Sequence, residues 1–164
     1  MELVKENDTI LKTKVDIFTG SILDISHYFD DMYKIMLDNN GLGLAATQVG
    51  LSLRFFLMRS NDTFEVFLNP EILEVSTDML FETEGCLSFP ELYLKIYRPK
   101  FIKVRYTNKE NKVVEDILDE FNARCFIHEF EHLEGVTFDT KAGDFELQRA
   151  KEKRRKTNRK KTRI

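Results

Sequence analysis

The segment His128-Glu129-Phe130-Glu131-His132 has residue types and a spacing that suit metal chemistry. On a helix, residues four apart lie only about 40° apart around the axis, so both imidazoles leave the same face. That spacing suits two ligands of one tetrahedral metal, and Glu129 can reach a water molecule beside the metal as a general base. The alternative is a pair of hydrogen-bonded core histidines. We favour the metal site, because the surrounding helix is too apolar to leave two histidines without partners.

A catalytic metal needs a third protein ligand in addition to His128 and His132. Metzincin proteases carry a histidine six residues after the second one; Phe138 stands there in this chain, which excludes that site. A ligand on a separate segment would surround the metal better than a third ligand from the same helix, and Cys86, in Glu84–Pro90, offers one. A thiolate beside two imidazoles suits Zn²⁺ or Fe²⁺. The candidates that remain open are Cys86, Cys125, Glu134, Asp139 and Asp144.

A third segment, Gly41–Gly50, is rich in small residues and matches the dinucleotide-binding pattern Gly-x-Gly-x-x-Ala. That pattern requires a strand before it and a helix after it. Here a helix is predicted before the segment and a strand after it, so we reject a dinucleotide-binding site. We expect instead a loop that brings its backbone and the Gln48 amide close to a ligand. The alternative is a plain helix cap followed by a turn.

These segments must be positioned by elements that the apolar pattern predicts. The order is one helix, several strands and then two helices, which is typical of a single α+β domain rather than of alternating βαβ units. A hairpin connection is expected at 107–111. The predicted helices are 24–38, 120–133 and one beginning near Asp144, and the predicted strands are 53–59, 64–68, 72–75, 101–107 and 113–118.

The composition bounds the class of protein and its compartment. The chain has 164 residues and is 42% hydrophobic, enough for one ordinary core. No apolar run approaches the roughly 18 residues of a membrane span, and the first residues lack the pattern of a secretory leader. Two distant cysteines do not make a disulfide framework. We therefore expect a cytoplasmic protein that has neither a membrane nor DNA as its partner.

The charge is distributed unevenly along the chain. Residues 149–164 hold ten Lys or Arg and one acid, whereas residues 1–148 hold 15 basic and 27 acidic residues. We accordingly divide the chain into a domain at 1–148 and a basic extension at 149–164. Such an extension indicates a polyanionic partner, with RNA the obvious one, or else a solvated charged terminus.

The three segments together resemble the peptide deformylase family. Its pattern is Gly-φ-Gly-φ-Ala-Ala-x-Gln, then Glu-Gly-Cys-φ-Ser, then His-Glu-φ-Asp-His, where φ is apolar. This chain has Gly41–Gln48, Glu84–Ser88 and His128–His132 in that order, and the resemblance covers roughly residues 39 to 139. It implies an enzyme that removes the formyl group from the N-terminal methionine of nascent proteins. The implied fold has antiparallel strands packed around a central metal-binding helix, with a basic C-terminal helix.

The resemblance also implies the metal ligands and the catalytic base. Cys86, His128 and His132 would bind Fe²⁺, for which Zn²⁺, Ni²⁺ or Co²⁺ can substitute. A metal-bound water would attack the formyl carbon, with Glu129 as general acid and base. The products would be formate and a free amino terminus.

Other roles follow from the same resemblance. The Gln48 amide and the Leu87 backbone N–H would stabilise the oxyanion. Gly43 would border the peptide, and the methionine side chain would enter a pocket near Phe121, Cys125 and His128. In bacterial members of the family a C-terminal helix docks on the ribosome, which implies the same partner for the basic extension.

Two further residues are assigned to the surroundings of the metal, and two others depart from the family pattern. Glu84 and Arg98 would form an ion pair that steadies the Cys86 loop. Glu131 replaces the usual Asp between the ligands, and Tyr93 stands where some bacterial members carry Arg.

Two other functions remain open at this point. One is a metallopeptidase that uses the same helix with a downstream carboxylate. The other is a ribosome- or RNA-associated protein with a closed structural metal site, for example one with both Cys86 and Cys125 as ligands.

Overall fold

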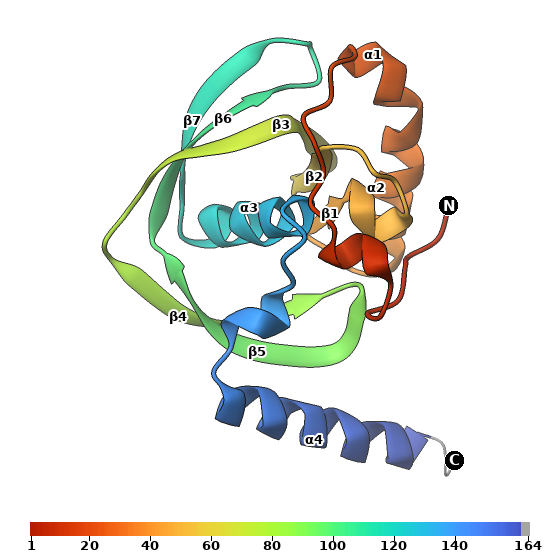
Figure 1. The fold of residues 1–164 in the computed structure, drawn as a ribbon, viewed down its shortest axis with the longest axis vertical. Helices are drawn as coiled ribbons and strands as arrows, with labels where there is room; N and C mark the ends of the chain where they lie inside the picture. Colours follow the sequence, from red (N-terminus) through yellow and green to blue (C-terminus); the bar gives the residue numbers. More distant parts are fainter. Residues whose placement is uncertain (162–164) are drawn as a thin grey trace.

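The computed structural model describes residues 1–161, which form two antiparallel sheets and four α-helices (Figure 1). The larger sheet has the strand order β1-β2-β3-β6-β7, and β4 pairs only with β5. The strands of the larger sheet are β1 Gly43–Ala45, β2 Phe55–Ser60, β3 Thr63–Val75, β6 Phe101–Thr107 and β7 Val113–Asp119. The hairpin of the smaller sheet consists of β4 Met79–Cys86 and β5 Phe89–Pro99.

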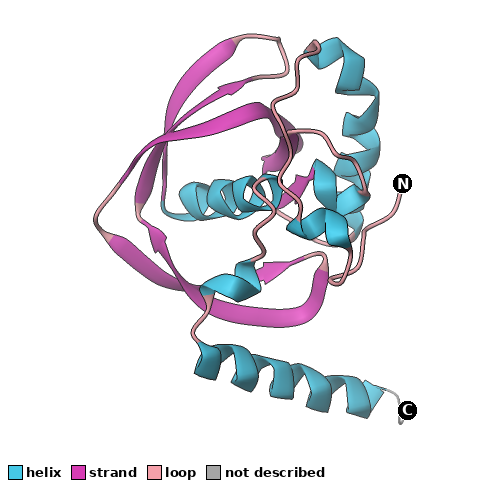
Figure 2. Cartoon of the chain, viewed as in Figure 1, coloured by secondary structure: helices cyan, strands magenta, loops and turns pink. Residues whose placement is uncertain are grey.

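Helices flank the larger sheet, and one long helix extends along the outside of the molecule (Figure 2). The α-helices are α1 Ile22–Ile25, α2 Phe29–Asp38, α3 Glu120–Leu133 and α4 Asp144–Lys161. Short 3₁₀ turns lie at Thr9–Lys12, Ser26–Tyr28, Ala46–Val49 and Phe138–Lys141. Among residues 1–161, no helix is both long and apolar enough to cross a bilayer.

The core lies on both faces of the larger sheet because successive strand residues point to opposite sides. On β2, Phe55 and Leu57 face α2, while Phe56 packs beneath α3. Phe126 of α3 stands edge-on to Phe56, at a centroid distance of 5.0 Å, and it also packs against Phe67. The strands thereby enclose α3, which is the helix that carries the two histidines (Figure 1).

Most of the predicted elements are confirmed. The helix expected at 120–133 has these bounds, and β6 and β7 form the predicted hairpin. The helix expected at 24–38 is α1 and α2 joined by a 3₁₀ turn, and it starts earlier because Ser21 caps it: the Ser21 hydroxyl accepts from the Leu23 N–H at 3.3 Å. A helix does begin at Asp144.

Three strand features differ from the prediction. The strands expected at 64–68 and 72–75 are one strand, β3, whose pairing with β6 shifts register twice. The β4–β5 hairpin was not predicted. A proline usually interrupts regular strand pairing, but Pro90 lies inside β5, in the irregular segment between the pairs Cys86↔Phe89 and Gly85↔Tyr93.

Gly135 ends α3 and allows the N-terminal segment to cross the helix end closely. Its φ is +70°, and an added Cβ would come within 2.9 Å of backbone atoms of Lys12, Thr13 and Lys14.

We expect Gly135→Ala to lower the free energy of unfolding by about 2 kcal/mol or more, because backbone strain adds to the overlap. Urea unfolding measures this loss. Gly143→Ala, with nothing within 4 Å, is the matched control; equal stability of both variants would contradict the argument.

Candidate metal centre and active-site cavity

The two histidines of α3 and the cysteine at the end of β4 meet in the structure. The centroids of the His128 and His132 rings are 5.1 Å apart, and Cys86 Sγ lies 3.3 Å from His132 Nε2. One ligand atom from each of the three residues lies within 4.8 Å of the others. Of the open candidates for the third ligand, Cys86 is the one that this cluster contains.

The geometry and chemistry of this cluster fit a metal ion. In a tetrahedral site with ordinary Zn–S and Zn–N bonds, a sulfur and a nitrogen ligand lie about 3.5 Å apart. The contact between Cys86 and His132 is close to that separation. Glu84 Oε2 lies 3.0 Å from His128 Nδ1, which leaves Nε2 of that ring for a metal. Cys86, His128 and His132 could therefore hold a divalent ion that accepts soft ligands.

The two histidines differ in their electrostatic surroundings. Burial opposes a proton on His128, but hydrogen bonds with Cys86 and Glu84 outweigh it and hold the pKa of His128 well above its usual range. Burial and the neighbouring His128 hold the pKa of His132 well below its usual range. The neighbours of His128 thus favour positive charge at its ring, and a metal cation bound there would meet the same neighbours.

A buried ion-pair network supports the cluster from behind. Arg98 Nε and Nη2 donate to the two Glu84 oxygens at 2.7 and 3.0 Å, so the predicted ion pair is confirmed. Glu131 also meets Arg98, whose Nη1 donates to its Oε1 at 2.8 Å. Burial disfavours the Glu84 charge, yet its bonds to Arg98 and His128 prevail and lower its pKa to about 2.

Sequence reasoning missed Arg124, which completes this network. Its Nη1 donates to Glu84 Oε1 at 2.7 Å. Its guanidinium also donates to the main-chain oxygens of the hairpin residues Leu80, Glu82 and Ile96. The available signal was an arginine in an otherwise apolar helical segment, because a buried cation needs a buried anion and carbonyl partners.

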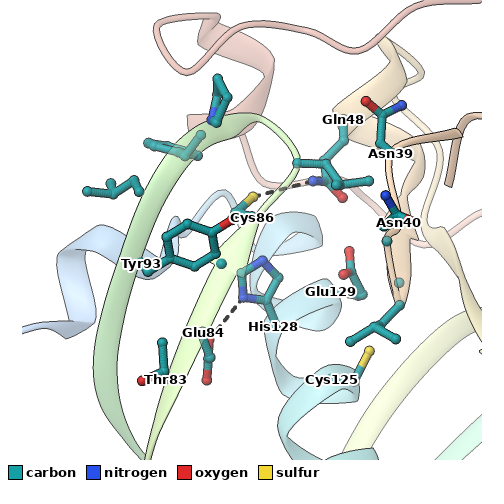
Figure 3. Close-up of a pocket in the computed structure, with 18 of the residues that line it drawn as sticks. Asn39, Asn40, Gln48, Thr83, Glu84, Cys86, Tyr93, Cys125, His128 and Glu129 are labelled. Atoms are coloured by element: carbon teal, nitrogen blue, oxygen red, sulfur yellow. Dashed lines mark hydrogen bonds and ion pairs between the residues drawn. The ribbon is translucent and has the colours of Figure 1, made fainter. Parts of the chain in front are cut away.

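Glu129 points into the cavity from α3 (Figure 3), and Gly43 of β1 lines the same cavity. It is 4% exposed, its Oε2 has no hydrogen-bond partner among the described residues, and burial raises its pKa to about 7. A Cβ on Gly43 would lie 2.5 Å from Glu129 Oε1. Glycine at position 43 therefore makes room for the carboxylate.

Gln48 lies on the opposite side of Cys86, and its amide has a fixed orientation. Its Oε1 accepts from the Ala45 N–H at 2.8 Å, which directs Nε2 toward Cys86 Sγ and Ser88 Oγ, each at 3.5 Å. Figure 3 shows the contact with Cys86. The loop expected to bring an amide close to a ligand site does so.

Most of the residues assigned to the site surround one cavity of about 500 Å³. Of the residues assigned to the metal, the reaction or the substrate, His132 is the one that does not line it; its side chain is buried. Phe121 and Tyr93, also on the wall, are largely exposed. The proposed residues on the cavity wall are Gly43, Gln48, Glu84, Cys86, Leu87, Phe121, Cys125, His128 and Glu129.

Glu84→Gln tests the buried network through stability. Because Arg98 and Arg124 would lose their buried anion, we expect a loss of about 3 kcal/mol in unfolding free energy at neutral pH. The folded pKa of about 2 lies below the ordinary 4.5, so the loss should be full above pH 4.5 and shrink as the pH falls toward 2. Urea titrations at several pH values measure it. Glu115→Gln, which breaks an exposed pair with Arg105, should change little; a pH-independent Glu84→Gln deficit would contradict the prediction.

Comparisons with known proteins show the family to which the chain belongs. The family model for polypeptide deformylase matches residues 1–147. A peptide deformylase of Thermotoga petrophila is 42% identical over 129 residues, which is 79% of each chain. The crystal structure of peptide deformylase from Thermotoga maritima superimposes with a TM-score of 0.83 at 37% identity, covering 87% of this chain and 97% of that one. The peptide deformylase of Synechococcus elongatus in complex with actinonin gives 0.88 at 30% identity, covering 93% and 85%. The chain belongs to the peptide deformylase family.

Proposed function

We propose that this protein removes the N-formyl group from the N-terminal methionine of nascent proteins and releases formate. The observation that carries the proposal is the buried Glu129 carboxylate beside the cluster of Cys86, His128 and His132, in a cavity open to a peptide. Formylated chains emerge from ribosomes, so the proposal places the reaction in the cytoplasm.

Cys86, His128 and His132 are the proposed metal ligands, which makes α3 the central metal-binding helix. Fe²⁺ is the proposed native ion, and Zn²⁺, Ni²⁺ or Co²⁺ can occupy the same donors. When bound, the ion supplies Lewis acidity that lowers the pKa of water and stabilises charge on the formyl oxygen.

Glu129 is the proposed general base and acid. A carboxyl with a pKa of about 7 can take the proton from the attacking water and later give it to the leaving amine at neutral pH. The water oxygen bonds to the formyl carbon, and the bond between that carbon and the amine nitrogen then breaks. Formate and a free α-amino group result.

Two donors are proposed for the negative charge that develops on the formyl oxygen. Gln48 Nε2 is oriented by the bond between its Oε1 and Ala45 N, so it needs little rearrangement during the reaction. The backbone N–H of Leu87, next to Cys86 in the chain, is the second donor. Both residues line the cavity.

The rest of the cavity is proposed to hold the peptide. Gly43 lies in the edge strand β1, where an extended peptide can pair as an added strand. The methionine side chain would lie against Phe121, Cys125 and His128, all of which line the cavity.

Formate release from an N-formyl-Met tripeptide tests the reaction directly. Anaerobically purified protein loaded with Fe²⁺ or Ni²⁺ should release formate, and Glu129→Gln should lower kcat by about 100-fold or more, because a positioned proton-transfer group contributes about that much. The variant should keep its metal content, since Glu129 is outside the ligand cluster. A retained rate in Glu129→Gln would reject its role.

A matched non-formylated peptide separates deformylation from the two other functions. Cleavage of its ordinary peptide bonds would indicate a metallopeptidase. A folded, metal-loaded protein that attacks neither peptide would indicate a structural metal. The structure favours deformylation because Glu134, Asp139 and Asp144 lie outside the metal cluster, as does Cys125.

The basic extension, residues 149–164, is proposed to bind the ribosome, while residues 1–148 form the catalytic domain. The first turns of α4 pack through Leu147 and Ala150 against the hydrophobic cluster that contains the buried residues of β5. Farther along the helix, Arg154 forms an ion pair with Glu6 at 2.7 Å. Lys151 and Lys153 remain exposed on this anchored helix and can face phosphate groups.

Deleting residues 149–164 should weaken ribosome co-sedimentation, and Lys151→Gln with Lys153→Gln should weaken it while leaving the contact between Arg154 and Glu6 intact. Wild-type binding should fall steeply with salt, because lysines that neutralise phosphates release counterions. Lys109→Gln with Lys112→Gln is the control, with the same change of charge on the exposed β6–β7 turn. Co-sedimentation that neither truncation nor salt alters would refute the proposed docking.

A further inference from the structure

The outward face of the β4–β5 hairpin carries large aromatic side chains. Along β5, Leu92, Leu94 and Ile96 point inward and are buried, whereas the intervening residues point to solvent. Tyr93 and Tyr97 are each 63% exposed, and Phe81 on β4 is 45% exposed. Exposed aromatic residues grouped on one face of a sheet indicate a binding surface.

These side chains are held in one row by the pairing of the two strands. Phe81 is the direct partner of Tyr97, and their rings stack at a centroid distance of 4.4 Å. Lys95 Nζ lies 5.8 Å from the centroid of the Phe81 ring. Tyr93 pairs with Gly85, and its ring covers that glycine so closely that a Cβ there would lie 2.9 Å from Tyr93 Cε1. We call Phe81, Tyr93, Lys95 and Tyr97 the aromatic track.

The aromatic track begins at the cavity. Tyr93 lines it together with Gly85 and Thr83, and Figure 3 shows the Tyr93 side chain on β5 at the cavity. From Tyr93 the track continues through Lys95 to Tyr97, four residues along β5. At about 3.4 Å per residue this is about 14 Å, the length of roughly four residues of extended peptide.

We propose that the aromatic track binds the part of the formylated polypeptide that follows the residues held in the cavity. This inference rests on the proposed deformylase function, because it concerns how the same substrate leaves the same site. The rings offer rigid apolar surface at little entropic cost, and Lys95 adds one positive charge. The matching partner is an extended chain with apolar or acidic side chains.

The charges of the hairpin favour a peptide over RNA as the occupant. Proteins that bind single-stranded RNA combine stacking rings with several cations along the backbone path. The track holds a single cation, Lys95, and Glu91 lies at its cavity end. The concentrated positive charge of the chain lies in the C-terminal extension instead.

Kinetics with peptides of two lengths test the proposal. Wild-type, metal-loaded protein should show a KM about five- to tenfold lower for an N-formyl-Met octapeptide with apolar and acidic residues at positions four to eight than for the matched tripeptide, as expected for a few aromatic contacts. We call this lower KM the octapeptide advantage. In the double variant Phe81→Ser with Tyr97→Ser, the octapeptide advantage should disappear. The kcat and KM of the variant for the tripeptide should stay at wild-type values, because neither residue lines the cavity.

Val113→Ser with Ile117→Ser is the control, since both residues are exposed on β7 of the other sheet. It should keep the advantage of the octapeptide. Lys95→Glu should lower that advantage for an acidic octapeptide only, and serves as a second test should the double variant be unstable. Equal KM values for both lengths in the wild type would overturn the proposal, as would an unchanged advantage in the Phe81 and Tyr97 variant.

Two further results are distinguishable from these. Absence of formate from both peptides in the wild type would reject the proposed function itself, and the track proposal with it. An octapeptide advantage that survives in the double variant, together with weakened ribosome co-sedimentation, would assign the track to RNA and overturn the peptide proposal.

Discussion

The arrangement of the site depends on one buried carboxylate, that of Glu84. It lies at the end of β4, accepts hydrogen bonds from Arg98 of β5 and Arg124 of α3, and contacts His128 Nδ1. A buried charge is tolerated only when it is paired and hydrogen-bonded, so these elements must meet at one place. The same contacts bring Cys86, two residues after Glu84, to the face of α3 that carries His128 and His132. The three proposed metal ligands are thereby held from two segments of chain.

The cavity combines this rigid support with a carboxylate that has few partners. Glu129 is held between the ligand cluster and β1, and the absence of a side chain at Gly43 provides its space. Burial disfavours its charge and, against the opposing effects of His128 and the Ala45 backbone, raises its pKa to about 7. Glu84 and Glu129 therefore have opposite protonation behaviour although both are buried near His128. Hydrogen bonds from Arg98 hold Glu84 ionised, whereas at Glu129 burial outweighs the attraction of His128.

The local part of this arrangement could be predicted from the sequence, because helical periodicity places His128 and His132 on one face. The third ligand could not be fixed by spacing alone; it required the resemblance or the structure, since Cys86 reaches α3 only through the fold of the hairpin. That hairpin was missed because exposed tyrosines alternate with buried aliphatics on β5, which hides the period of two. Arg124 was missed because its partners are main-chain oxygens and a carboxylate at least 28 residues away in sequence.

We propose that the Cys86 thiolate and the two imidazoles of α3 bind one metal ion. The most direct measurement is the absorption spectrum of Co²⁺-loaded protein, since a thiolate ligand adds a sulfur-to-metal charge-transfer band to the Co²⁺ spectrum. We expect that band at one Co²⁺ per chain in the wild type, its loss in Cys86→Ser, and its retention in Cys125→Ser. A band that survives Cys86→Ser, or that disappears in Cys125→Ser, would contradict the ligand set.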